Sequence, residues 1–349
     1  MTGQLVEQVL AGRRRAVARV ISLVEDAQRR SEAQALLAAL HPHTGQAHII
    51  GVTGPPGSGK STLVNALALH LRQGAQDQSQ PPRVAIVAVD PTSPFSGGAI
   101  LGDRIRMRDL SGDRGIFIRS MASRGNLGGL AWATADTVKV LDAAGYELVI
   151  VETVGAGQAE VDIARTAHTT IVVEVPGLGD DVQAIKAGIL EIADVFAVNK
   201  ADLEGADHAV MALRMMLDLG TGGAHTVMHH GRLLEVVNSV PHAGSSPQDE
   251  DTWQTPIHKT VATRREGIAK LADSVLAHRA YLERSGVLDW RERERAAAEL
   301  ETIVQQESLR RVLDHTDQTH LAALIDQIVQ RQIDPYTASQ SLLAGLDAT

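Results

Sequence analysis

The chain of 349 residues contains no cysteine, and only 3% of its residues are aromatic. The absence of cysteine excludes disulfides, cysteine-ligated zinc, iron–sulfur clusters and a thiol nucleophile, and it fits a reducing cytoplasm. No apolar run approaches the length of a membrane span, and the polar N-terminus, with its basic run at 13–15, does not resemble a secretory signal. A basic excess is also missing, and a net charge of −9 argues against general nucleic-acid binding. We therefore expect a cytoplasmic protein that binds neither membranes nor nucleic acid.

Apolar runs and helical patterns alternate through the middle of the chain. Strands rich in valine and isoleucine that alternate with helices are typical of an α/β fold, with a largely parallel sheet covered by helices on both faces. The predicted strands are 47–53, 83–89, 115–119, 146–151, 169–175, 194–198 and 257–262. The predicted helices between them are 60–72, 129–144, 181–192 and 203–218.

Both ends of the chain predict helices outside this alternating core. Residues 3–40 carry apolar side chains at helical spacing, and long helices are expected beyond about residue 265. Asp334 followed by Pro335 predicts an N-cap and the start of a last short helix. The late helices must bury their apolar stripes either within the monomer or in a dimer. The expected domains are an N-terminal helical extension at 1–45, a nucleotide-binding domain at 46–270 and a C-terminal helical dimerisation arm at 271–349.

The most specific pattern is a glycine-rich segment that follows the apolar run at 49–52. It fits G-x-x-x-x-G-K-[ST], the phosphate loop, in the strand–loop–helix setting that this motif needs. Its glycines let backbone N–H groups turn toward a polyphosphate, and the start of the next helix adds a positive end. Lys60 is expected to reach the outer phosphates, and the Ser61 hydroxyl is expected to ligate Mg²⁺. The predicted phosphate-binding residues are Gly54, Pro55, Pro56, Gly57, Ser58, Gly59, Lys60, Ser61 and Thr62.

A second motif, N-K-x-D at 199–202, follows the predicted strand at 194–198. The Asp202 carboxylate can accept from the ring N–H and the exocyclic amino group of guanine, whereas adenine would leave it unpaired. Asn199 is expected to tie this loop to the phosphate loop, and Lys200 to lie along the base. The spacing of the two motifs therefore favours GTP over ATP. A second base-binding loop is expected at 259–263, so the predicted base-binding residues are Asn199, Lys200, Asp202, Val261 and Ala262.

An enzyme of this kind needs acidic groups near Mg²⁺ and a segment that senses the γ-phosphate. Asp90, Asp103 and Glu152 lie at or after the carboxyl ends of predicted strands, where parallel sheets deliver ligands. The Gly155 N–H is expected to contact the γ-phosphate, and Gln158 is a candidate for orienting the attacking water. No residue stands out as a general base, so hydrolysis is expected to depend on positioning and charge stabilisation. The candidate catalytic residues are Lys60, Glu152, Gly155 and Gln158.

A third loop candidate spans 176–188, again directly after a predicted strand. Its glycines permit rearrangement, and its charged side chains could pair across a subunit boundary or contact the nucleotide of a partner subunit. The simpler interpretation is a strand–helix loop with capping aspartates, and spacing alone does not decide between them. The candidate switch residues are Asp180, Asp181, Gln183 and Lys186.

Taken together, the strings at 54–62, 90–107, 152–158, 176–181 and 199–202 resemble those of the MeaB/MMAA family of G-protein chaperones, also called ArgK-type. The resemblance extends over most of the chain. It implies a homodimeric P-loop GTPase of the SIMIBI class that dimerises through C-terminal helices. It also implies a partner, an adenosylcobalamin-dependent acyl-CoA mutase, for which such proteins gate cofactor loading and prevent inactivation.

By the same resemblance, the Mg²⁺-linked positions are Ser61, Asp90, Asp103 and Glu152, and 176–188 is the additional switch that carries partner signals. Slow intrinsic hydrolysis that the mutase accelerates is also implied. Thr92 replaces a more usual serine, and the region around His225, His229 and His230 is idiosyncratic. These departures leave the partner open among methylmalonyl-CoA, isobutyryl-CoA, 2-hydroxyisobutyryl-CoA and ethylmalonyl-CoA mutases.

Three other interpretations are open. A GTPase that inserts nickel into a metallocentre would need a Cys/His site, and only a histidine cluster at His225, His229, His230 and His242 could supply one. An ATP-dependent kinase or transport ATPase conflicts with Asp202. The third interpretation is a non-enzymatic binding module with vestigial hydrolysis. It can be partly true together with the GTPase chaperone interpretation, because a slow GTPase is mainly a timed binder.

Overall fold

The computed structural model describes residues 2–73, 81–91, 108–110, 112–123, 129–153, 163, 166–177, 187–220, 225–229, 232–236 and 252–344. The chain divides into two compact units, Met1–Asp289 and Trp290–Thr349. The predicted boundaries after residues 45 and 270 stay predictions.

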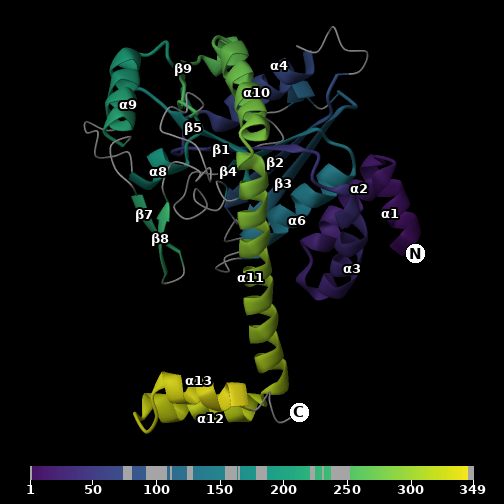
Figure 1. Ribbon diagram of the computed structural model, residues 1–349. Coiled ribbons are helices and arrows are strands. Elements are labelled where there is room, and N and C mark those ends of the chain that lie inside the picture. The colour runs from purple at the N-terminus through teal and green to yellow at the C-terminus, as the bar shows by residue number, and fades with distance from the viewer. Residues whose placement is uncertain are drawn as a thin grey trace. The chain divides into compact units, whose positions relative to one another are not determined.

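The first unit is built on a seven-stranded sheet in which all neighbouring strands are parallel. The strand order is β3-β2-β4-β1-β5-β6-β9, and Figure 1 shows these strands, with all but β6 labelled. This confirms the predicted α/β fold with a parallel sheet. The strands are β1 (His48–Thr53), β2 (Val84–Pro91), β3 (Ile116–Ser123), β4 (Leu148–Thr153), β5 (Thr169–Glu174), β6 (Val195–Val198) and β9 (Ile257–Lys259).

Alternate side chains of each strand enter different cores, because successive residues of a strand point to opposite faces. Ala85 and Val87 of β2 belong to one cluster, whereas Val84 and Ile86 belong to another. The first cluster packs against α6 (Gly129–Ala143) and the N-terminal helices α1 (Thr2–Leu10), α2 (Arg14–Val24) and α3 (Arg30–Leu40). The second packs against α4 (Lys60–Gln73) and α10 (Ile268–Arg284).

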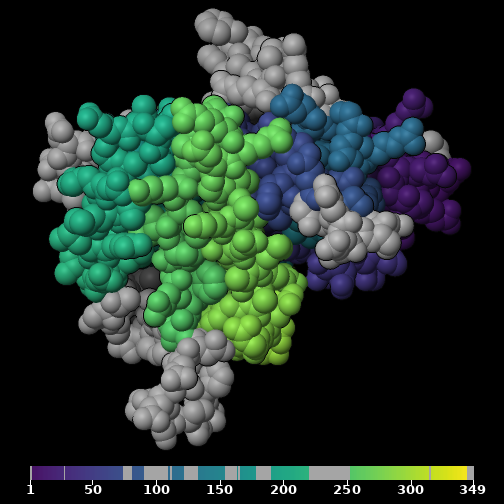
Figure 2. All heavy atoms as spheres, turned by 90° about the horizontal axis from the view of Figure 1, so that it is seen from above, coloured from purple at the N-terminus to yellow at the C-terminus, as the bar shows by residue number. Residues whose placement is uncertain are grey.

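Two further helices, α8 (Ala187–Ile192) and α9 (Ala206–Gly220), pack at the β6 end of the sheet around Phe196. Seen from above, the N-terminal helices and this end of the sheet lie on opposite sides of the unit (Figure 2). An antiparallel hairpin, β7 (His225–His229) and β8 (Arg232–Val236), was not predicted. Its strands are five residues long and lie in a stretch for which neither a strand nor a helix was predicted.

The second unit is helical, as predicted for this part of the chain. It contains most of α11 (Val287–His315), then α12 (Gln318–Val329) and α13 (Pro335–Ala344). The Asp334 carboxylate accepts from the N–H groups of Tyr336 at 2.8 Å and Thr337 at 3.1 Å, so the predicted cap of the last helix is confirmed. Across the described ranges, no helix has the length and apolarity that crossing a membrane requires.

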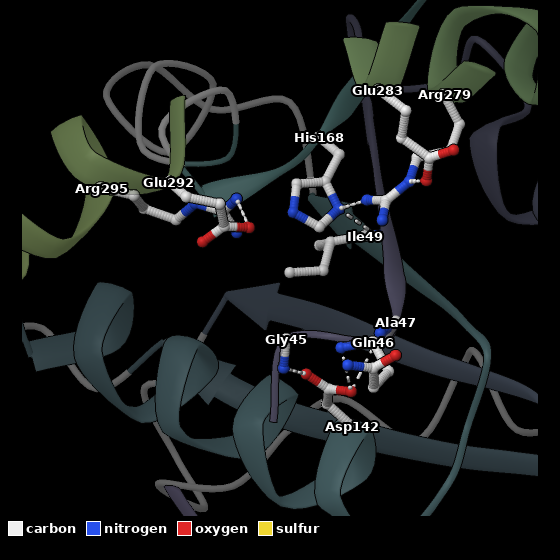
Figure 3. Close-up of polar contacts among 10 residues, drawn as sticks. All are labelled: Gly45, Gln46, Ala47, Ile49, Asp142, His168, Arg279, Glu283, Glu292 and Arg295. Carbon is white, nitrogen blue, oxygen red and sulfur yellow. Dashed lines mark hydrogen bonds and ion pairs between the residues drawn. The ribbon is translucent and has the colours of Figure 1, made fainter. Parts of the chain in front are cut away.

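Asp142 fixes the segment that leads from the N-terminal helices into the sheet. Its carboxylate accepts from three consecutive backbone N–H groups, those of Gly45 at 2.5 Å, Gln46 at 3.2 Å and Ala47 at 2.9 Å (Figure 3). The side chain is buried on α6. Because hydrogen bonds to a charged acceptor are among the strong ones, this contact sets where β1 begins.

A chain of buried polar groups crosses the amino ends of three strands. His48, at the start of β1, contacts the Thr169 hydroxyl of β5 through Nε2 at 2.8 Å. The same hydroxyl lies 2.9 Å from Nδ1 of His278 on α10. His278 Nε2 in turn lies 3.3 Å from the Asp194 carboxylate, just before β6. This chain of contacts ties α10 to the strands that lead into the loops at 54–59 and 199–202.

His168, just before β5, joins the same edge of the sheet. Its Nδ1 accepts from the Ile49 N–H and from the Arg279 guanidinium, both at 3.0 Å (Figure 3). Because both partners are donors, Nδ1 carries no proton. Arg279 also contacts Glu283 at 2.6 Å, so its orientation is fixed from both sides.

Burial lowers the pKa of His48 well below its usual value, and the charges of His168, Arg279 and His278 lower it further. The folded protein therefore keeps His48 neutral where the unfolded chain protonates it. Stability should be fully present above about pH 6.5 and should fall below it by up to about 1.4 kcal/mol per pH unit, until the folded pKa is reached.

Urea unfolding between about pH 8 and pH 5 measures this loss. His48→Gln should flatten the acid limb of the stability curve, whereas His41→Gln, at an exposed position, should leave it unchanged. A His48→Gln curve as steep as that of the wild type would contradict the assignment.

Candidate nucleotide site

The phosphate-loop motif lies between the carboxyl end of β1 and the first residue of α4, Lys60. Gly54 has a φ of 140°, and a Cβ there would lie 2.1 Å from the Val173 carbonyl oxygen of β5. Gly59 has a φ of 86°, and its Cβ would lie 2.6 Å from Asn199 Nδ2. Side chains are therefore excluded at both ends of the loop, which leaves its backbone free to approach a ligand.

Lys60 is 6% exposed and lies folded over this loop. Its Nζ donates to the carbonyl oxygens of Gly54 at 2.8 Å and Pro55 at 2.9 Å. A buried ammonium is favourable only when such oxygens surround it. The charge thus lies at the loop itself, where the sequence predicts a polyphosphate.

Two of the four predicted Mg²⁺-linked residues are in contact. The Ser61 hydroxyl donates to Glu152 Oε1 at 2.6 Å, and both side chains are buried. Parallel pairing of β1 and β4 explains the contact, because it sets Val52 beside Glu152. A hydroxyl and a carboxylate oxygen are the kind of ligand that Mg²⁺ prefers. Asp90 lies in β2, where the register sets it beside Ala122 of β3.

Asn199 joins the two nucleotide motifs through its side-chain amide. Its Nδ2 donates to the Ser58 carbonyl at 2.8 Å, so the expected tie to the phosphate loop is present. Its Oδ1 accepts from the Thr260 hydroxyl and from the Ala262 N–H, both at 3.2 Å. One buried amide thus links three loops, those at 54–59, 199–202 and 260–264.

The base-reading candidates lie around this junction. Lys200 has a left-handed backbone, with a φ of 55°, and its Nζ donates to the Gly57 carbonyl at 2.9 Å. Asp202 is paired with Arg264 at 3.2 Å. Val261 and Ala262 are both buried in the neighbouring loop. Arg264 was not predicted, because no spacing rule marks an arginine in a loop about 60 residues after its aspartate.

Several predicted site residues lie outside the described part of the chain, and their roles stay predictions. They are Asp103, Gly155, Gln158, Asp180, Asp181, Gln183 and Lys186. Thr62 lies in α4, directly after Ser61.

Two of the four histidines considered for a metal lie outside the described residues. His230 and His242 are not described, and His225 and His229 are described only as backbone of β7. Within the ranges that the structure covers, no three histidine, aspartate or glutamate side chains are grouped so as to hold a metal ion.

The chain is similar to several known proteins. Residues 17–317 match the family described as "Methylmalonyl Co-A mutase-associated GTPase MeaB". A protein of Pyrococcus abyssi whose name describes it as a GTPase is 45% identical over 343 residues, which cover 98% of this chain and 96% of that protein.

Two further similarities bear on architecture. A fused isobutyryl-CoA mutase of Nocardia farcinica is 44% identical over 213 residues, which are 60% of this chain but 19% of that much longer protein. A crystal structure of a LAO/AO transport system kinase superposes with a TM-score of 0.64, at 22% identity, covering 99% of this chain and 97% of that one. The second similarity supports the fold alone.

Removing the Asn199 amide should detach the base loops from the phosphate loop. Asn199→Ala should raise the Kd for GDP by about 30-fold or more, because three hydrogen bonds are lost and buried partners are left unpaired. Asn199→Asp keeps an acceptor for Thr260 and Ala262 but loses the donor to Ser58. If this variant raises the Kd for GDP by a similar factor, the effect comes from the hydrogen bond between Asn199 and the phosphate loop. Calorimetry with GDP measures both variants, and an unchanged Kd in Asn199→Ala would contradict the role.

Proposed function

The chain belongs to the MeaB family of GTPases, and from this premise we propose that it serves an adenosylcobalamin-dependent acyl-CoA mutase. In this proposal, the GTP-bound and GDP-bound forms gate loading of the cofactor into the mutase and protect the mutase from inactivation. The junction at Asn199 carries the nucleotide part of the proposal, because it couples the phosphate loop to both base loops.

Hydrolysis in this proposal depends on position and charge. Lys60 binds the outer phosphates and stabilises the charge that develops on them, as the buried ammonium at the loop supports. Ser61 and Glu152 would hold Mg²⁺, directly or through water, since their oxygens already face each other. When bound, the ion supplies neutralising charge to the β- and γ-phosphates. Asp202 reads the guanine edge and sets the preference for GTP.

The mutase part of the proposal is supported by the relative from Nocardia farcinica. There, a segment 44% identical to this chain is part of one polypeptide with an isobutyryl-CoA mutase. Fusion keeps two modules at a high effective concentration, which favours modules that act on each other. We propose that this chain makes the same kind of contact as a separate protein, with a mutase of the acyl-CoA class in the cytoplasm.

We also propose a homodimer through the second unit. Large apolar side chains of this unit are exposed, among them Ile325, which is 51% exposed, and Val329, which is 75% exposed. These two residues lie four positions apart on α12 and share one helix face. An apolar face of this kind is typical of a surface that a second protein covers.

Purified methylmalonyl-CoA, isobutyryl-CoA, 2-hydroxyisobutyryl-CoA and ethylmalonyl-CoA mutases should be tested as partners. One of them should accelerate GTP hydrolysis by at least about tenfold and should bind with different affinities in GDP and in a non-hydrolysable GTP analogue. Lys60→Ala should lose productive nucleotide binding and therefore the response. If no mutase binds or accelerates hydrolysis, the proposed partner class is wrong.

Sedimentation of the full chain tests the dimer. The wild type should sediment as twice its mass of 37.2 kDa, and Ile325→Lys combined with Val329→Lys should shift it to the monomer, because two charges cannot be buried unpaired. Gln330→Lys, at an exposed position on the same helix end, should leave the dimer intact. A wild type that is monomeric at every concentration would overturn the proposal.

A further inference from the structure

The Asp202 carboxylate contacts Arg264, an arginine that no nucleotide motif contains. Arg264 Nη2 lies 3.2 Å from Asp202 Oδ2. The two side chains are 59% and 36% exposed, so the pair contributes little to folding. The pair is of interest because Asp202 is the residue that would meet the guanine base, not because the ion pair is strong.

The backbone that presents Arg264 is fixed on several sides. Arg264 is the last residue of η5 (Ala262–Arg264), and its N–H donates to the Val261 carbonyl at 2.9 Å. Val261 and Glu266 form an antiparallel bridge that closes the turn. Gly267 follows, and a Cβ there would lie 2.1 Å from the Lys259 carbonyl oxygen. These contacts therefore fix the backbone position of Arg264.

The same turn is bonded to the loop that carries Asp202. The Ala201 N–H donates to the Thr260 carbonyl at 3.0 Å, and the Ala262 N–H donates to Asn199 Oδ1 at 3.2 Å. Asp202 and Arg264 thus extend from two loops that are held together by hydrogen bonds of the backbone and of the Asn199 side chain. These hydrogen bonds between the loops bring the two side chains close enough to pair.

The chemistry of the carboxylate leaves room for both partners. An ionised aspartate has two oxygens and about four positions at which it can accept a hydrogen bond. Guanine would use one position on each oxygen, for its ring N–H and its exocyclic amino group. Arg264 takes one position on Oδ2, so it can keep its contact while guanine occupies the others.

We propose that Arg264 is a positioning residue for base recognition, which holds the Asp202 carboxylate in the orientation that meets both guanine donors. This rests on the proposed role of Asp202 and goes beyond it, by naming the group that orients the carboxylate. Without Arg264, the side chain of Asp202 can rotate. This affects a base that needs both carboxylate oxygens in place more than a base that uses its ring N–H alone and has no exocyclic amino group. Discrimination between guanine and hypoxanthine, which lacks that group, should therefore depend on Arg264.

Calorimetry with GDP, IDP and ADP tests the proposal on the full chain. Arg264→Ala should raise the Kd for GDP by about fivefold to tenfold, the factor for one ordinary hydrogen bond, because the pair with Asp202 is exposed, and it should change the Kd for IDP less. Arg264→Lys, which keeps the charge without the planar fork, should recover part of the GDP-over-IDP preference. Arg265→Ala is the matched control, because it removes the guanidinium of the next residue, which is exposed.

Asp202→Asn separates the two assignments. If it leaves the preference for GDP over ADP intact, the proposed role of Asp202 fails. If it abolishes that preference while Arg264→Ala leaves the GDP-to-IDP ratio unchanged, or tightens GDP binding, only the inference about Arg264 is overturned. In the Asp202→Asn background, Arg264→Ala should have no further effect, because the two residues act through one contact.

Discussion

The nucleotide site depends on one buried amide. Asn199 donates to the Ser58 carbonyl and accepts from Thr260 and the Ala262 backbone, so loops from three parts of the chain meet at a single side chain. An amide suits this position because it offers donors and an acceptor at a fixed angle. The neighbouring Gly59 has no room for a Cβ against the same amide. The spacing between the phosphate end and the base end of the site is therefore set by covalent geometry and a few hydrogen bonds.

The parallel sheet makes this junction possible. In a sheet whose strands all run the same way, every carboxyl end lies at one edge, so β1, β4 and β6 deliver the loop at 54–59, Glu152 and the loop at 199–202 to the same place. The opposite edge carries the contacts of His48 and its neighbours, which bind α10 to the starts of these strands. β1 and β6 thus have amino ends that contact α10, directly or through neighbouring side chains, and carboxyl ends that carry nucleotide-site residues.

Much of the fold follows from local sequence. Runs of valine and isoleucine predicted the strands of the sheet, and the Asp334–Pro335 pair predicted the start of α13. Motif spacing also predicted that Asn199 would reach the phosphate loop. Long-range contacts are different: no local pattern connects Asp142 to the backbone of 45–47, or Arg264 to Asp202, because these contacts depend on how distant elements pack. The hairpin of β7 and β8 was also not predicted from the local sequence.

The left-handed backbones of Lys200 and Arg265, with φ values of 55° and 59°, have a consequence for how this protein can be altered. A non-glycine residue in this conformation costs about 1–3 kcal/mol, and both residues lie in the loops that meet at Asn199. Glycine would relieve the strain at either position, but at Lys200 it would also remove the ammonium that contacts Gly57. A glycine at Lys200 would thus raise stability at the expense of nucleotide recognition. A glycine at Arg265 can raise stability without that loss.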